Sequence, residues 1–250
     1  MSLSEEYRRQ FSWRDWPRAL DALPSLQGMS VLDLGCGAGD LSAEMAARGA
    51  RVIGLELNEE LLGEARSRSI PGARFHACDL RHLPDFGPVD GIWSSFAAAY
   101  FPDLAPVLAS WARQLRSGGW IALTEVDDLF GHEPLSALAK SRFAAYARDA
   151  LQTGRYDFHM GGKLRGHLEE GGFGVSKSLA LQDRELSFEG PALPEVCDAW
   201  RARFERMPLL RDLCGSHFEA ARDEFLGCLT HPDHRSLAKV HFLLASRGAA

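Results

Sequence analysis

The feature that most constrains this chain is a run of glycines at alternate positions, directly after a short apolar segment. The run is Val31-Leu-Asp-Leu-Gly-Cys-Gly-Ala-Gly-Asp40, with Gly35, Gly37 and Gly39. Residues without a Cβ atom let the backbone turn tightly and let a ligand approach it closely. The N–H groups at the start of a following helix suit a polar or anionic ligand group. The segment therefore predicts a buried strand that turns sharply into a helix at a ligand-binding site.

Strands and helices alternate through the first half of the chain. Apolar strands separated by helices indicate a parallel sheet that is covered on both faces. Ligands of such sheets bind at the carboxyl ends of the strands. The expected strands are 31–34, 51–57, 73–78, 89–94 and 120–126, and the expected helices are 41–48, 58–68 and 104–115.

The parts of the chain that flank this alternation are predicted to be mainly helical. Residues 4–27 carry apolar side chains near helical spacing, and Pro24 marks the predicted helix end. Further on we expect helices over 132–153 and 162–170, an extended segment over 175–188 and a final strand over 236–246. The mostly helical segment at about 190–235 is interpreted as an insertion before that strand. The predicted parts are thus 1–28 and 29–250, with the insertion inside the second.

The composition restricts the partners and the compartment. The formal net charge is −6, and an acidic balance argues against a protein that mainly grips phosphate backbones. The five cysteines form no C-x-x-C pair, which favours reduced thiols. No secretory signal opens the chain, and no run approaches the length of a membrane span. We therefore expect a cytoplasmic protein without a nucleic-acid or membrane partner.

The glycine run resembles motif I of class I S-adenosylmethionine (SAM)-dependent methyltransferases, because Asp33 stands two residues before the first glycine. The resemblance implies a Rossmann-like, seven-stranded, mostly parallel sheet with helices on both faces. It also implies an N-terminal helical lid and a helical cap inserted before the last strand. Asp33 would help to hold the amino-acid end of SAM; alternatively, it only accepts hydrogen bonds from backbone N–H groups of the glycine turn.

Other residues at the predicted strand ends match the same family. Glu56 ends the second strand, where an acid can accept both ribose hydroxyls. Asp79 resembles the family's acceptor for the adenine amino group, with the N–H of Leu80 beside the ring. Ser95 and Phe96 follow the fourth strand, where the family closes on the cofactor. The residues predicted to bind SAM, whose product is S-adenosylhomocysteine, are Tyr7, Gln10, Asp33, Gly35, Cys36, Gly37, Gly39, Glu56, Leu57, Asp79, Leu80, Ser95 and Phe96.

Two later segments extend the resemblance to roughly residues 28–190 and the final strand. Residues 115–123 resemble the family's "L-x-P-G-G-x-L" turn before its fifth strand, with Ser117 where proline is commoner. Residues 162–173 resemble the helix before its sixth strand. A NAD site is the alternative interpretation of the glycine turn, but the third glycine falls early for the dinucleotide motif.

The acceptor side is less defined, because SAM is already activated and a base is needed only when the nucleophile arrives protonated. Tyr7 and Gln10 either close over the cofactor or pack against the sheet edge. Either histidine named below could equally be an ordinary surface residue. The predicted acceptor contacts are Tyr100, Glu125 and Asp127, and the candidate catalytic residues are His132, His159 and Tyr156.

Three further patterns are weighed against bland alternatives. The pair Asp127-Asp128 could suggest a metal-dependent transferase of the catechol type, but serines stand where that family needs a second acid. Cysteines and histidines over 214–217 and 228–234 have zinc-like spacings, yet such steps also serve ordinary helix packing. No metal site is predicted. The arginines between 201 and 211 favour a solvated helix face, although that face could bind an anionic small substrate.

Together these patterns predict a SAM-dependent methyltransferase that moves the sulfonium methyl to an O or N atom of a small molecule. Proximity and exclusion of water would be its main catalytic contributions. One alternative is an RNA or protein methyltransferase on the same fold. Another is a SAM-binding protein or an enzyme with non-methyl chemistry, such as aminocarboxypropyl transfer or cyclisation. The oligomeric state stays open, with a homodimer as one option.

Overall fold

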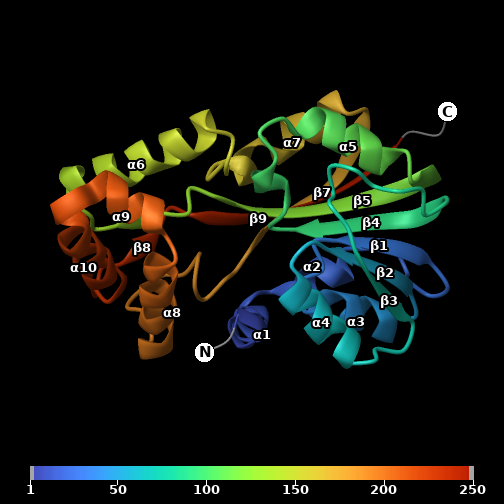
Figure 1. Ribbon diagram of the computed structural model, residues 1–250, viewed down its shortest axis with the longest axis horizontal. Coiled ribbons are helices and arrows are strands. Elements are labelled where there is room, and N and C mark those ends of the chain that lie inside the picture. The colour runs from blue at the N-terminus through green and yellow to red at the C-terminus, as the bar shows by residue number, and fades with distance from the viewer. Residues whose placement is uncertain (1–2, 248–250) are drawn as a thin grey trace.

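A seven-stranded sheet with the strand order β3-β2-β1-β4-β5-β9-β7 organises the molecule (Figure 1). The computed structural model describes residues 3–247, so the outermost residues of both predicted parts lie outside it. Strands β1 to β5 pair in parallel, whereas β9 runs antiparallel to β5 and β7. The predicted Rossmann-like, mostly parallel sheet is confirmed. The strands are β1 (Ser30–Leu34), β2 (Arg51–Glu56), β3 (Ala73–Ala77), β4 (Val89–Ser95), β5 (Leu115–Asp127), β7 (Phe173–Leu181) and β9 (Lys239–Arg247).

Helices cover both faces of this sheet. Figure 1 shows α2 (Trp16–Asp21), α3 (Asp40–Ala47) and α4 (Glu59–Ser67) on one face, and α5 (Leu104–Ala112) and α7 (Met160–Glu170) on the other. Successive residues of a strand point to opposite faces. Accordingly, Val31 belongs to one hydrophobic cluster, and Leu32 and Leu34 belong to another. The first strand is therefore buried on both sides, as its continuous apolar sequence requires.

A second lobe stands beside the sheet, at the left of Figure 1. It contains α6 (Ala137–Gln152), α8 (Pro194–Glu205), α9 (Pro208–Cys214), η2 (Gly215–His217) and α10 (Phe218–Leu229), with a small sheet of β6 (His132–Glu133) and β8 (Arg235–Ser236). Helices α8 to α10 follow β7 and precede β9 in the chain. Their apolar faces form an aromatic core, in which the ring centroids of Trp200 and Phe225 lie 4.6 Å apart.

The first 27 residues do not form the single helix predicted for them. Helix α1 (Leu3–Trp13) ends where Arg14 forms an isolated β-bridge with Asp183, and α2 starts only at Trp16. The N–H of Asp15 donates to the carbonyl of Gln182 at 3.1 Å. This long-range backbone pairing replaces the helical hydrogen bonds, so the helix breaks at that point.

Two further boundaries differ from the prediction because of strand pairing. Strand β5 already begins at Leu115, so the predicted turn before it lies within the strand, opposite a register shift between Val89 and Gly91. The helix expected from residue 132 begins only at Ala137, because residues 132 and 133 pair with β8. Within residues 3–247, no helix combines the length and apolar character that crossing a membrane requires.

Candidate functional site

A cavity of about 870 Å³ lies at the carboxyl ends of β1, β2, β3 and β4, beside the glycine turn. This volume is in the range of small-molecule sites, about 300–1,000 Å³. The sheet order reverses between β1 and β4, and such a switch point is where ligands of open α/β sheets bind. The predicted site residues that line the cavity are Tyr7, Gln10, Asp33, Gly35, Cys36, Gly37, Glu56, Leu57, Asp79, Leu80, Ser95, Phe96, Tyr100 and Tyr156.

The glycine turn has backbone angles that favour glycine. Gly35, Gly37 and Gly39 have φ values of +77°, +55° and +80°. The N–H groups of Gly35 and Cys36 both donate to the carbonyl of Leu55, at 2.8 and 3.0 Å. A Cβ on Gly37 would lie 3.3 Å from the ring of Tyr7. Helix α1 thus places an aromatic ring directly against the turn, where only a residue without a side chain fits comfortably.

Glu56 ties the turn to the end of β2. One carboxylate oxygen accepts from the N–H of Gly37 at 3.0 Å, and the other accepts from the N–H groups of Leu57 and Asn58 at 2.9 and 2.8 Å. These bonds fix the carboxylate at the cavity wall. The side chain therefore has a bracing role in addition to the ligand contact predicted for it.

Asp33 is a buried carboxyl group behind the same turn. Burial raises its pKa to about 7, the hydrogen bond from the Ser42 hydroxyl opposes this shift, and the charge of Glu56 adds to it. The Ser42 Oγ to Asp33 Oδ2 distance is 2.6 Å. Near neutral pH this group can either carry a negative charge or hold a proton, so a cationic ligand group beside it would favour the charged form.

Asp79 follows β3 and is held by its own loop. The side chain and the N–H of Arg81 donate to both of its oxygens, at 2.7 to 3.1 Å. These hydrogen bonds hold the pKa of Asp79 below its usual value. Phe96, on the facing wall, has a φ of +56°, and its N–H donates to the carbonyl of Thr124 at 2.8 Å. Such backbone strain in a bulky residue is characteristic of functional sites.

The far side of the cavity is formed by aromatic rings and a cation. The rings of Tyr100 and Tyr156 meet edge to face, with centroids 4.9 Å apart. Burial raises the pKa of Tyr100 to about 12, and burial raises that of Tyr156 well above its usual value. Both hydroxyls therefore keep their protons at neutral pH. Arg203, from α8, completes this wall.

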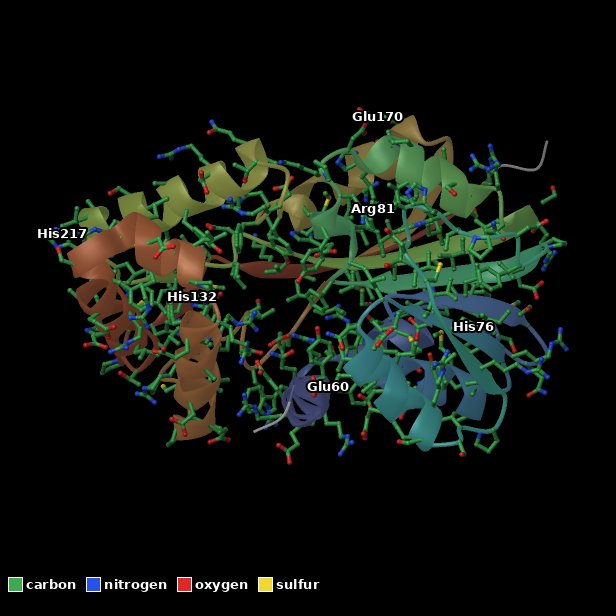
Figure 2. The ribbon with its side chains drawn as sticks, in the orientation of Figure 1. Glu60, His76, Arg81, His132, Glu170 and His217 are labelled. Carbon is green, nitrogen blue, oxygen red and sulfur yellow. The ribbon has the colours of Figure 1, made fainter. Side chains whose placement is uncertain are left out.

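The structure does not support His132 as a general base at this cavity. Its side chain is 1% exposed, it does not line the cavity, and its Nδ1 lies 3.0 Å from Nε2 of His234. Figure 2 shows it in the second lobe, well to one side of Arg81. Burial and the neighbouring His234 lower its pKa to about 3. The ring is thus a neutral core residue, because long-range packing buries it.

Three other predicted residues lie near the cavity without lining it. Glu125 is fully buried under η1 (Ala98–Tyr100), where the N–H of Ala99 donates to its Oε1 at 3.1 Å. Asp127 faces His159, whose Nδ1 lies 3.4 Å from its Oδ1, and the His159 side chain is 51% exposed. Gly39 starts α3 behind the turn. Of the proposed catalytic residues, Tyr156 is the one that reaches the cavity.

The burial of Glu125 predicts a pH effect on folding. Burial raises its pKa to about 8, against an ordinary value of 4.5. A raised pKa stabilises the fold fully below the unfolded value, and this contribution is lost as the pH rises through about 8. E125Q, which stays neutral, should therefore gain stability relative to the parent protein between about pH 5 and pH 9. Urea midpoints across that range measure the difference, and a constant difference would contradict the buried-acid assignment.

The sequence prediction missed the two arginines of the cavity. Arg14 and Arg203 both line it, whereas the arginines around 203 had been predicted to form a solvated face. Arg203 follows Val196 by seven residues and Trp200 by three, both of which are buried. That spacing puts it on the apolar side of the helix, and this signal in the sequence could have located it. Within residues 3–247, no three His, Cys, Asp or Glu side chains are grouped as for a metal ion.

Comparisons with known proteins agree with this geometry. A family model described as "Methyltransferase domain" matches residues 31–119. The ubiquinone biosynthesis O-methyltransferase of Dechloromonas aromatica (strain RCB) is 30% identical over 149 residues, 58% of this chain and 61% of that protein. The trans-aconitate 2-methyltransferase of Azoarcus sp. (strain BH72) is 35% identical over 106 residues, 42% of each. The chain thus spans less than two thirds of the length of these curated relatives.

A solved structure shows the same fold over most of the chain. It is a Haemonchus contortus phosphoethanolamine N-methyltransferase 2 in complex with phosphomonomethylethanolamine and S-adenosylhomocysteine. Its TM-score is 0.58 at 18% identity, covering 93% of this chain and 53% of that one. The strand order, the glycine turn braced by Glu56 and the methyltransferase-domain match identify the chain as a member of the class I S-adenosylmethionine-dependent methyltransferases.

Proposed function

We propose that this protein transfers the methyl group of SAM to an O or N nucleophile of a small molecule. The observation that carries the proposal is the joint position of the glycine turn, Glu56 and Asp79 around one cavity, which continues to Tyr100 and Tyr156. A cavity of this kind can hold a nucleoside at one end and a modest acceptor at the other.

The residues at the turn fit the cofactor. Glu56 presents a fixed carboxylate for ribose hydroxyls, Asp79 can accept from the adenine amino group, and Asp33 favours a cationic group beside it. The other predicted contacts surround these three. When bound, SAM supplies a methyl group that is already activated by a positively charged sulfur.

The chain's own contribution is to position the acceptor and to keep water out. Phe96, Leu129 and Leu186 give the cavity apolar walls, which favour displacement of water. Tyr156 keeps its proton at neutral pH, so its hydroxyl would orient the acceptor nucleophile rather than remove its proton. Transfer would then depend mainly on holding the reacting atoms in line at short distance.

The flanking elements are assigned roles on the same basis. Residues 1–28 would form a lid, because Tyr7 and Gln10 of α1 line the cavity over the glycine turn. Helices α8 to α10 would cap the acceptor end, since Arg203 of α8 lines it. All five cysteines are buried and unpaired, which supports a reducing, cytoplasmic setting.

Product analysis tests this function directly. The purified protein is incubated with SAM and a panel of small-molecule acceptors, and the nucleoside products are separated. Methyl transfer should release S-adenosylhomocysteine. Release of methylthioadenosine would instead indicate attack at another carbon of the sulfonium, and intact SAM would indicate a binding protein; either result would refute the proposal. Bulk tRNA as the best acceptor, with steeply salt-dependent binding, would favour the RNA alternative.

A further inference from the structure

The two ends of the cavity differ in the charge that they present. Carboxylates line the end at the glycine turn, namely Asp33, Glu56 and Asp79 with Asp40 beside them. The end formed by the helices presents guanidinium groups instead, from Arg14 between α1 and α2 and from Arg203 on α8. A ligand that spans the cavity therefore meets negative groups at one end and positive groups at the other.

The arginines are held in place by acids that do not themselves line the cavity. Arg203 donates from Nε and Nη2 to Oε1 of Glu185, at 3.2 and 2.5 Å. Arg14 donates from Nε to Asp183 at 2.7 Å. The side chains of Glu185 and Asp183 are 0% and 1% exposed, against 20% for Arg203 and 13% for Arg14. The positive end of each ion pair thus faces the cavity, and the negative end is buried behind it.

Arg203 has the geometry of a docking group for an anion. Within residues 3–247, its Nη1 makes no hydrogen bond, so the guanidinium edge away from Glu185 is available. Burial works against the charge of Arg203, but the charge and hydrogen bonds of Glu185 outweigh it and raise its pKa. The planar edge of a guanidinium matches the two oxygens of a carboxylate.

The surroundings of Arg203 favour a small acid with an apolar or aromatic body. The rings of Tyr100 and Tyr156 and the side chain of Leu186 line the same part of the cavity. These groups can enclose a carbon skeleton, while the acids at the glycine turn repel an anion from the other end. This charge pattern would orient an anionic acceptor with its nucleophile toward the cofactor end.

We propose that Arg203, positioned by Glu185, binds a carboxylate of the methyl acceptor, so that the acceptor is a small organic acid. The inference rests on the proposed methyltransferase function. It does not come from the matched family segment, because Arg203 lies outside residues 31–119. The cofactor carries a carboxylate of its own, so the test has to separate the two anions.

The test uses matched acids and amides as probes, with the full chain saturated with S-adenosylhomocysteine. The panel contains 4-hydroxybenzoate, benzoate and succinate, each paired with its neutral amide, and the readout is the shift in melting temperature. The parent protein should be stabilised more by acids than by amides. R203M should lose this preference. R201M should keep it, because Arg201 lies on the same helix, is 53% exposed and pairs with Asp198.

Removing Arg203 alone leaves Glu185 buried without its partner, so a second variant is needed. R203M/E185Q removes both charges and should also lose the preference for acids. The affinity for S-adenosylhomocysteine, measured by calorimetry, should stay within about threefold of the parent value in both variants.

Several results would overturn the proposal. These are equal shifts from acids and amides in the parent protein, including no shift from either, and a preference for acids that survives in R203M/E185Q. A large loss of S-adenosylhomocysteine affinity in that variant would assign the guanidinium to the cofactor's carboxylate instead. Failure of the methyltransferase function itself would show differently, as SAM left intact or converted to methylthioadenosine.

Discussion

E56A should reduce the affinity for S-adenosylhomocysteine about 100-fold. The substitution removes a charged acceptor for the ribose hydroxyls, and hydrogen bonds to charged groups contribute about 1.5–3 kcal/mol each. Loss of about 2.8 kcal/mol corresponds to a hundredfold change in the dissociation constant. Isothermal titration calorimetry measures the effect.

The control for this variant is E60A, because Glu60 is exposed on the neighbouring helix α4 and does not line the cavity (Figure 2). Melting curves of both variants report any loss of the brace between Glu56 and the N–H of Gly37. D79A should weaken binding as well. Parent-like affinity in both E56A and D79A would show that the nucleoside binds elsewhere.

G39A should destabilise the fold by about 2–5 kcal/mol, from two separate costs. An alanine in the left-handed region costs about 1–2 kcal/mol, and overpacking costs about 1–3 kcal/mol. At Gly39, φ is +80° and a Cβ would lie 2.9 Å from Cζ of Phe75. Urea unfolding measures the change, and the displaced turn should also bind S-adenosylhomocysteine more weakly.

Gly63 offers a matched control in the adjacent helix. It lies inside α4, and a Cβ there would meet nothing within 4 Å. Alanine in a helix interior is more favourable than glycine by about 0.5–1 kcal/mol, so G63A should stabilise the protein. Opposite signs are therefore expected for the same chemical change. A loss of stability in G63A, or none in G39A, would contradict this account of the turn.

The parts of the fold that were predictable from sequence depend on local patterns. The apolar run of β1, the glycine turn and the cap of α4, where Asn58 Oδ1 accepts from the N–H of Leu61 at 3.0 Å, are each encoded within a few residues. The carboxylates of the cofactor end were predictable for the same reason, since each follows directly on its own strand.

The parts that were not predictable depend on contacts between distant segments. The break after α1 comes from the pairing of Arg14 with Asp183, and no local pattern marks it. His132 is buried against His234, which is 102 residues away, so its position in a sequence of mixed character did not reveal its burial. The acceptor end is built from the α1–α2 junction, η1 and α8, and only their assembly shows which side chains meet.

The position of α1 has a consequence for the kinetics of turnover. This helix is tied to the sheet side by an ion pair between Arg8 and Glu64, and to the second lobe by one between Glu6 and Arg206. Tyr7, between these two anchors, rests on Gly37. Exchange of the spent nucleoside therefore requires both latches to open together. Salt screens ion pairs of this kind, so ionic strength would act on the rate of product escape before it acts on the chemical step.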